Sequence, residues 1–399
     1  MTAPLQRRIL TMNRGSATLK SALYEAVDRE ELLFSMTVDQ AGSSGDRLKI
    51  ADLRGAALLD SPVDPGDPDT ALEVMFAWLG GHEFLSGLAA AGHRLVHGGS
   101  RYKEPQRITP EFLTEIERLV PLDPDHLPAA IRGIKFIAKK FPELPQVACF
   151  DTAFHSSLPK VARMYALPGN LYDQGILRYG FHGLSYEYVM GELQALEAQL
   201  ASGRVIIAHL GNGASMVAVN EGKSIDTSMG FTPLEGLVMG TRSGDVDPGL
   251  LLYLLEQKKM SAKETSTMLN KESGLLGVSG TSGDMRNLLE KMQQDSRAGE
   301  AVELFCYRAK KYIGAYAAVL GGLDVLVFAG GIGERAPVVR KWICDGLDFL
   351  GVRLDALSNE ANAALISSPA SAVQVRVIKT NEDLMIVRHV LSNLGWTNS

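Results

Sequence analysis

Glycine-bracketed polar turns are concentrated between residues 204 and 249. The apolar run 205–210 predicts a buried strand, and it ends directly in Gly211-Asn212-Gly213. Glycines tolerate positive φ and leave backbone N–H groups uncovered, so such a turn can surround a phosphate. A second turn, 240–244, places Arg242 between small residues, where its guanidinium can hold a phosphoryl group through paired N–H donors. Each turn alone would be an ordinary surface loop, but their concentration favours an anion site.

A strand, a polar turn and a returning strand occur in both halves of the chain. In the first half, residues 8–12 and 21–25 predict two such strands around an Asn/Gly/Ser turn. In the second half, the 205–210 strand is followed by a hairpin of residues 216–220 and 223–227. One such unit in each half suggests an internal duplication, although the literal identity is low.

Three further side chains occupy positions where chemistry is common. Arg94 comes at the end of a predicted strand, before a pair of glycines, and Asp151 directly follows the strand 146–150. A carboxylate at the carboxyl end of a strand is a frequent catalytic placement in α/β sheets. His182 lies in a glycine-bracketed turn that begins a helix, where a lone His is more often structural.

The composition sets the class of protein. A chain of 399 residues is too long for one ordinary core, so two domains are expected. Its 46% hydrophobic and 22% charged residues are typical of a soluble globular protein. The net charge of −6 argues against nucleic acid or an anionic membrane as the main partner, so an anionic ligand would need a local cluster of Arg and Lys.

Targeting and redox signals favour the cytoplasm. Cys149, Cys306 and Cys344 are odd in number and widely spaced, which predicts neither a disulfide framework nor a zinc site. Residues 2–8 carry no apolar signal-peptide region. The apolar run 312–333 contains an acidic residue and several glycines, so a buried helix followed by a buried strand is expected there.

The remaining pattern predicts alternating helices and strands. Residues 39–69 are expected to be loop-rich with a small surface excursion, 273–277 to be a loop, and 329–334 to be a glycine-rich turn after the strand 324–328. A last strand is expected at 373–378. Helices are expected at 70–88, 110–119, 127–139, 183–200, 248–257, 261–270, 282–293, 301–320 and 384–394.

Two nucleotide motifs are only partly matched. Gly222-Lys223-Ser224 resembles the end of a P-loop, but Val217 occupies the position of the upstream Gly, and the segment is a hairpin. Gly331-x-Gly333-x-x-Ala336 fits the dinucleotide fingerprint loosely, with Asp355 at a suitable distance for a ribose contact. A dinucleotide-dependent dehydrogenase is therefore a weak alternative.

Together these features match the needs of phosphoryl transfer, which are cationic donors around the phosphoryl oxygens, a metal held by oxygen ligands, and backbone amides on the other phosphates. The chain also resembles the acetate kinase family over nearly its whole length, and two of the matching runs, Gly-Phe-Thr-Pro-Leu-Glu-Gly-Leu and Gly-Thr-Arg-Ser-Gly-Asp-Val-Asp-Pro-Gly, are long and specific. The matching segments are 13–20, 93–99, 150–155, 178–185, 209–215, 224–249, 283–286, 328–334 and 380–385.

This resemblance implies an α/β fold with two duplicated, actin-like (ribonuclease H-like) domains that flank an active-site cleft and close on substrate. The expected N-terminal domain is 1–155, carries the carboxylate-side residues, and is completed by the C-terminal helix 384–399. The expected nucleotide-binding domain is 156–383.

The resemblance also implies catalytic roles. Arg94 and Arg242 would bind the substrate carboxylate and the transferring phosphoryl group, and His182 would stabilise the transition state. Asp151 would be the catalytic acidic residue.

The implied ligand sites follow in the same way. Asn13 and Glu382 would hold Mg²⁺ or Mn²⁺. Val96, Phe181 and Pro233, beside Arg94, would contact the methyl group of the substrate. The ATP site would be formed by Lys20, His209, Leu210, Gly211, Asn212, Gly213, Asp284, Met285, Arg286, Gly331, Ile332, Gly333, Glu334 and Arg335.

The sequence departs from the family pattern at several positions. Arg14, Ala17 and Thr18 stand in the first turn where small residues or Ser are usual, and Arg335 replaces a usual Asn. These changes affect the expected contacts to the nucleotide.

The segment after Pro121-Leu122 allows two registers for the active-site His of the family. One puts Asp123 at that position, and the other puts His126 there and restores the His-x-Pro spacing. The second is favoured, which makes His126 a fifth expected catalytic residue. Asp125 would then have to turn away from the acyl group, pair with a cation or belong to an enzyme with an altered substrate, because a carboxylate about 5 Å from acetate would cost roughly 3 kcal/mol. Of these, we expect Asp125 to turn away. Replacing Asp123 by Asn is then expected to change activity little.

The resemblance predicts reversible transfer of the ATP γ-phosphoryl group to acetate, giving acetyl phosphate and ADP, by a cytoplasmic homodimer without nucleic-acid or membrane partners. Propionate or another short carboxylate is the alternative acceptor. A non-catalytic ATP-binding module of the actin or chaperone type would share the fold without the two arginines.

Overall fold

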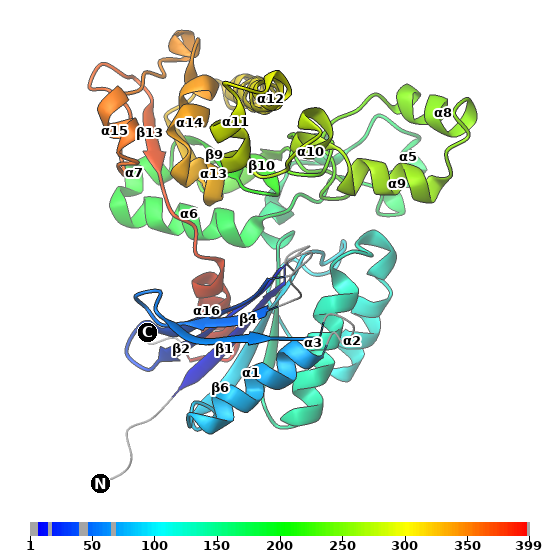
Figure 1. Ribbon diagram of the computed structural model, residues 1–399, viewed down its shortest axis with the longest axis vertical. Helices are drawn as coiled ribbons and strands as arrows, with labels where there is room; N and C mark the ends of the chain where they lie inside the picture. Colours follow the sequence, from blue (N-terminus) through cyan, green and yellow to red (C-terminus); the bar gives the residue numbers. More distant parts are fainter. Residues whose placement is uncertain (1–6, 15–17, 40–46, 65–68, 397–399) are drawn as a thin grey trace. The chain divides into compact units, whose positions relative to one another are not determined.

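The computed structural model describes residues 7–14, 18–39, 47–64 and 69–396. It divides into two compact units, Met1–Ala153 with Asn381–Ser399, and Phe154–Thr380 (Figure 1). In the first expected turn, residues 15–17 and the side chains of Arg14 and Thr18 lie outside the described part.

The first unit is built on an eight-stranded sheet in the order β5-β4-β3-β2-β1-β6-β8-β7. β1, β2 and β3 pair antiparallel, whereas β1, β6 and β8 run parallel. The strands are β1 Arg8–Arg14, β2 Thr18–Ala26, β3 Glu30–Asp39, β4 Arg47–Ala51, β5 Ala57–Pro62, β6 Leu88–Leu95, β7 Gln106–Arg107 and β8 Gln146–Phe150.

Helices cover both faces of this sheet. On one face α1 (Thr70–Gly81) buries Leu72, Met75, Phe76 and Leu79, while α2 (Pro110–Glu117) and α3 (Leu127–Lys140) pack beside it over β6 and β8. α16 (Glu382–Asn393) packs against β1, β6 and β8. A Cβ on Gly92 of β6 would lie 2.3 Å from a methyl carbon of Ile386, so this helix needs a glycine beneath it.

The second unit has a five-stranded sheet in the order β11-β10-β9-β12-β13. Its strands are β9 Arg204–Leu210, β10 Ala214–Asn220, β11 Lys223–Thr227, β12 Val325–Ala329 and β13 Gln374–Val377. α6 (Gly183–Leu196) packs on the face that carries Val205 and Ile207. α12 (Ser296–Leu320) contacts β9, β10 and β11 and lies on the opposite side of the sheet from α6 in Figure 1.

The two sheets share one topology. In each, three antiparallel strands are followed by two strands parallel to the first, so β3-β2-β1-β6-β8 corresponds to β11-β10-β9-β12-β13. After the last parallel strand of either sheet, the chain passes into the other unit and supplies a helix there, α6 after β8 and α16 after β13. The predicted class of duplicated α/β domains is confirmed.

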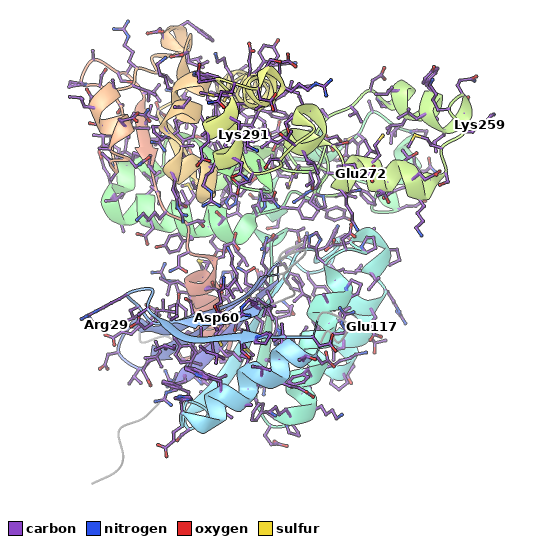
Figure 2. All side chains as sticks on the ribbon, viewed as in Figure 1. Arg29, Asp60, Glu117, Lys259, Glu272 and Lys291 are labelled. Carbon is purple, nitrogen blue, oxygen red and sulfur yellow. The ribbon has the colours of Figure 1, made fainter. Side chains whose placement is uncertain are left out.

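The second unit carries the larger set of helices. α8 (Pro248–Glu256) and α9 (Ala262–Lys271) form an excursion in which Lys259 occupies the turn between the two helices with φ 59° (Figure 2). The other helices of this unit are α4 Lys160–Arg163, α5 Gly169–Asp173, α7 Ala198–Ala201, α10 Gly274–Ser279, α11 Met285–Lys291, α13 Gly330–Arg335, α14 Pro337–Cys344 and α15 Ala356–Glu360.

Three expected loops were wrong. Within 39–69 the chain forms β4 and β5, because Leu48 and Ile50 alternate inward and extend the hairpin sheet. Residues 273–277 belong to α10, whose Leu275 is fully buried, and 330–335 form α13. In both helices glycines hid the helical pattern.

Two helix ends differ most from the prediction. α1 ends at Gly81 instead of 88, where the Gly80-Gly81 pair breaks it. α12 begins at Ser296 instead of 301, because the Asp295 carboxylate accepts hydrogen bonds from the N–H groups of Arg297 and Ala298.

The apolar run 312–333 contains the end of α12, β12 and the start of α13, as a buried helix followed by a buried strand. Across the described residues, no helix is long and apolar enough to cross a membrane. All three cysteines are buried, and none of them is part of a disulfide bond.

Candidate active site

The expected carboxylate-side residues of the first unit form one connected cluster. Asn13, Arg94 and Asp151 lie at or just beyond the carboxyl ends of β1, β6 and β8, and Glu382 begins α16. These three strands are parallel neighbours, so their ends share one edge of the sheet, where α/β proteins commonly bind ligands.

Arg94 is the centre of this cluster. Its Nε and Nη2 donate to the two carboxylate oxygens of Asp151 at 2.9 and 2.6 Å. Its Nη1 donates to Asn13 Oδ1 at 2.9 Å and lies 3.3 Å from Glu382 Oε2. Asn13 Nδ2 in turn donates to the same Glu382 oxygen at 2.8 Å. A bidentate Arg–carboxylate pair of this kind fixes the plane of the guanidinium.

The cluster carries an excess of negative charge. Burial lowers the pKa of Arg94, but the attraction of Asp151, Glu382 and Asp383 outweighs burial and raises that pKa well above its usual value. One guanidinium thus faces three carboxyl groups. Burial raises the pKa of Asp383, which accepts a hydrogen bond from Thr11 Oγ1 at 2.7 Å. Lys20 also attracts the Asp383 carboxylate, and a further cation at this edge would relieve the remaining repulsion among the carboxylates.

The oxygen donors of this edge fit a hard divalent cation. Mg²⁺ prefers one or two carboxylates together with phosphate oxygens and water, and Glu382 and Asn13 supply ligands of that type. Within the described ranges, no three His, Cys, Asp or Glu side chains are arranged to hold a metal.

In the second unit, the predicted phosphate turn connects β9 to β10. Gly211 N donates to Gly213 O at 3.0 Å, and Gly240 N donates to Asn212 O at 2.9 Å. A Cβ on Gly240 would lie 2.0 Å from Asn212 Oδ1, and one on Gly283 would lie 2.8 Å from Gly240 O. Three glycine-containing loops that are distant in sequence therefore pack backbone against backbone.

Two histidines stack beside this turn. The rings of His182 and His209 are 4.4 Å apart and tilted by 22°. His182 Nδ1 lies 2.8 Å from Ser215 Oγ, and His209 Nδ1 lies 2.7 Å from Ser185 Oγ. His182 adopts φ 59°, an uncommon conformation for a non-glycine residue that is often retained for function.

Arg242 reaches the same turn from the 228–245 loop. Its Nη1 donates to Pro233 O at 2.6 Å. A Cβ placed on Gly213 would meet Arg242 Nη2 at 2.9 Å and His182 Nε2 at 3.3 Å. The guanidinium and the imidazole therefore converge on Gly213, where an anion would be contacted by both.

The loop that carries Arg242 is held by residues that sequence reasoning gave no role. Arg178 donates to the carbonyls of Thr227, Ser228 and Met229 and, at 2.6 Å, to Glu235. At the other end of the loop, Asp245 accepts from Gly236 N at 2.9 Å and from Tyr312 OH at 2.7 Å.

α10 supports the same loop from its amino-terminal end. Leu275 N donates to Met239 O at 2.8 Å, and Leu276 N donates to Gly240 O at 2.9 Å. Gly274 has φ 62°, and a Cβ there would lie 2.2 Å from Met239 O, so the helix can approach only through a glycine. The glycines of residues 273–277 are the one sequence feature that could have indicated this close contact.

A cavity of about 370 Å³ opens beside the phosphate turn. Its volume suits a nucleotide-sized ligand. Eight residues expected at the ATP site line it, together with Gly283, Leu289 and Ala336. The eight are Gly211, Asn212, Asp284, Met285, Arg286, Gly331, Ile332 and Arg335.

The other expected nucleotide residues lie outside this lining. Glu334 is turned inward, where Oε1 accepts from Gly330 N at 3.1 Å and Thr380 N at 3.2 Å. Lys20 belongs to the first unit, on β2 opposite Asn13. His209, Leu210, Gly213 and Gly333 complete this set.

The expected acyl-contacting residues come from both units. Val96 is buried just after β6 in the first unit. Phe181, also buried, precedes His182, and Pro233 lies on the Arg242 loop, both in the second unit. Leu289, a cavity residue that sequence reasoning missed, could have been found by its helical spacing from Met285.

The two alternatives for the family His are neighbours in one turn. His126 is the N-cap residue of α3, and its Nδ1 lies 2.7 Å from Asp123 Oδ1. The Asp125 side chain between them in sequence is exposed. α3 packs against β6, the strand that carries Arg94.

Comparison with known proteins identifies the family. A family model described as the Acetokinase family matches residues 8–388. The acetate kinase of Rhodopseudomonas palustris is 47% identical over 388 residues, which cover 96% of this chain and 97% of that protein. The crystal structure of Porphyromonas gingivalis acetate kinase has a TM-score of 0.87 at 39% identity and covers 97% of this chain and 100% of its own. The crystal structure of a propionate kinase from Francisella tularensis subsp. tularensis SCHU S4 has a TM-score of 0.90 at 39% identity. It covers 96% of this chain and 98% of its own. The chain therefore belongs to the acetokinase family.

Proposed function

We propose that this protein is an acetate kinase, which transfers the γ-phosphoryl group of ATP reversibly to acetate in the presence of Mg²⁺. In the forward direction an acetate oxygen forms a bond to the γ-phosphorus, and the bond from that phosphorus to the bridging oxygen breaks. ADP leaves with the bonding electron pair, and acetyl phosphate is the second product.

The observation that carries this proposal is the approach of Arg242 Nη2 and His182 Nε2 to Gly213, beside a cavity lined by the expected ATP residues. Charge on the transferring phosphoryl group is spread over its equatorial oxygens, so fixed donors at that position stabilise the transition state. A dinucleotide-dependent dehydrogenase would have no use for this pair, and a non-catalytic module would have no need of it.

In the first unit, Arg94 would orient the acetate carboxylate, and Asp151 would hold the guanidinium in place through its two hydrogen bonds. Asn13 and Glu382 would hold the Mg²⁺, which when bound neutralises phosphate charge. The excess of carboxyl groups around Arg94 supports this assignment.

Acetate is the preferred acceptor in this proposal, and propionate is the second candidate. The curated relative from Rhodopseudomonas palustris is an acetate kinase, whereas the Francisella tularensis neighbour is a propionate kinase. Val96, Phe181 and Pro233 would contact the acyl chain. A single methylene changes binding in an apolar pocket by about 1–3 kcal/mol, so measured selectivity should be moderate.

The protein is proposed to act as a homodimer through α8. This helix has the sequence Pro-Gly-Leu-Leu-Leu-Tyr-Leu-Leu-Glu, and none of its residues is buried. Leu250, Leu252 and Tyr253 are 46%, 57% and 49% exposed. Clustered exposed apolar side chains of this kind usually mark an interaction surface. The buried free thiols are compatible with the cytoplasm, the compartment we propose.

Trapping of the product as an acyl hydroxamate tests the function. Purified protein with ATP, Mg²⁺ and hydroxylamine should form hydroxamate from acetate, more slowly from propionate, and more slowly still from butyrate. Excess chelator should abolish product formation, and added Mg²⁺ should restore it. Undiminished turnover in chelator, or no hydroxamate from any short carboxylate, would refute the proposal.

A further inference from the structure

Asp123 and His126 form a carboxylate–imidazole pair in the turn that begins α3. Asp123 is the C-cap residue of the short helix Val120–Leu122, and its carbonyl accepts from Leu127 N at 3.2 Å. His126 Nδ1 lies 2.7 Å from Asp123 Oδ1. Pro124 lies within the turn and restricts its backbone. The separation of the two side chains is therefore set by a short, stiff segment.

Burying the Asp123 carboxylate costs free energy unless a partner compensates for its lost hydration. The residue is 3% exposed. Its second oxygen, Oδ2, is buried and has no hydrogen-bond partner among the described residues. An unsatisfied buried polar atom costs about 1–3 kcal/mol, and more when it carries charge. Closing the turn requires only the backbone of Asp123, so the hydrogen bond to His126 is the contact that justifies this carboxylate.

The pair lies just before α3, the helix that borders Arg94. Ala129 and Ala130, in the first turn of α3, line a narrow cavity of about 20 Å³ together with Met12, His93 and Arg94. The His126 side chain retains 14% exposure, against 3% for Asp123. His126 is thus accessible to a ligand, whereas Asp123 is buried.

We propose that Asp123 is a positioning residue that acts through His126. It accepts the Nδ1–H of the imidazole, which fixes the ring orientation and leaves Nε2 for the ligand. The carboxylate also balances the charge of a ring protonated on both nitrogens, so Nε2–H can donate to an oxygen of the anionic acyl or phosphoryl group. This role rests on the proposed function, and it replaces the sequence-based expectation that Asp123→Asn changes activity little.

The Asn substitution separates this role from simple packing. With Oδ2 unpartnered, an Asn side chain must either bury an unsatisfied NH₂ group or turn that group toward His126 Nδ1. If the NH₂ group turns toward His126, the imidazole Nδ1 must accept its hydrogen bond. The ring proton then lies on Nε2, which is the opposite tautomer. The corresponding change in a Ser-His-Asp triad lowers kcat by about 10⁴ through the same tautomer error.

The experiment is a double-mutant cycle of Asp123→Asn and His126→Ala, with acetyl hydroxamate formation as the readout. Each single variant should lower kcat/KM by about 10-fold or more, and Asp123→Asn should cost nothing further in the His126→Ala background. Asp125→Asn, an exposed carboxylate in the same turn, is the matched control and should keep kcat/KM within about 2-fold. Thermal melting confirms that each variant is folded.

A spectroscopic readout does not depend on activity. In ¹⁵N-labelled protein, long-range ¹H–¹⁵N spectra, assigned by the loss of His126 signals in His126→Ala, should show a protonated Nδ1 in the wild type and a changed Nδ1 shift in Asp123→Asn. Unchanged His126 shifts, wild-type turnover by Asp123→Asn, or an equal loss in both backgrounds would each overturn the inference. Absence of phosphotransfer by the wild type would instead refute the proposed function, while the nitrogen shifts still test the pair.

Discussion

At the scale of single residues, Arg242 has the most specific proposed role, as a donor to the transferring phosphoryl group. Replacing it by Ala should lower kcat by about 10²-fold or more, the usual loss when a donor to transition-state charge is removed. Arg242→Lys keeps the charge but loses the paired donors, so it should recover only part of the rate. Steady-state kinetics with varied acetate and ATP measures both. A rise in KM alone would mean that Arg242 binds the ground state.

A substitution at Gly213 should change activity without changing stability. Its backbone φ is not in the left-handed region, so Ala is tolerated there, but the new Cβ would displace Arg242 Nη2 and His182 Nε2. A displacement near 1 Å at a reacting centre can cost about 10²-fold. The shift needed here is a few tenths of an ångström, so Gly213→Ala should lower kcat by about 10-fold with little change in Tm.

The matched control is Gly191→Ala on α6, where a Cβ has nothing within 4 Å. It should retain full activity. Wild-type kcat in Gly213→Ala would remove the argument that the guanidinium and the imidazole act at this turn.

At the scale of secondary-structure elements, two buried histidines connect parts of each unit. His93 on β6 bonds through Nε2 to Gln146 on β8 at 2.7 Å, and His155 Nε2 donates to Phe181 O at 3.0 Å. Burial lowers the pKa of each imidazole to about 4. In the unfolded chain the pKa of a histidine is about 6.5. Between that pH and about 4, these two imidazoles are therefore protonated in the unfolded state and neutral in the folded state.

Stability should therefore fall as the pH drops from about 6.5 toward 4, by up to about 3 kcal/mol for each histidine. Urea unfolding at pH 7 and pH 5 measures the effect. His93→Asn removes one of the two titrating imidazoles. Between pH 7 and pH 5, the free energy of unfolding of this variant should therefore fall by about 2 kcal/mol less than that of the wild type. His82→Gln, at an exposed position, should behave like the wild type. An identical pH dependence in His93→Asn would contradict the assignment.

At the scale of the whole molecule, α8 gives the proposed homodimer a test. A charge at Leu252, which is 57% exposed, should prevent burial of the helix in an interface, so Leu252→Glu should sediment as a monomer where the wild type is a dimer. Leu196→Glu introduces the same charge at a leucine that is 59% exposed on α6 and should remain dimeric. A monomeric wild type, or a dimeric Leu252→Glu, would exclude α8 as the interface.

The strands and helices that were predicted correctly are those whose hydrophobic pattern lies within one short segment. The strands 205–210 and 146–150 and the helix 127–139 are found with ends within one residue of those predicted, because apolar runs and periodicity report burial directly. Of the elements that were missed, β4 and β5 extend the hairpin sheet from β3, whereas α10 and α13 pack against segments that are distant in sequence. α10 packs against Met239 and Gly240 through its glycine, a contact that no local window contains.

The sequence by itself determined the kind of chemistry, since residue types, glycine spacing and strand ends are properties of short segments. It named Arg94, Asp151, Asn13 and Glu382 separately, and the turn at Gly211 apart from the loop at Arg242. Only the tertiary structure decided that the first four share hydrogen bonds and that Arg242 and His182 meet at Gly213. It also paired Asp123 with His126, although the sequence offered them as alternatives. The physical reason is that a distance between side chains depends on sheet pairing and helix packing, which bring distant segments together.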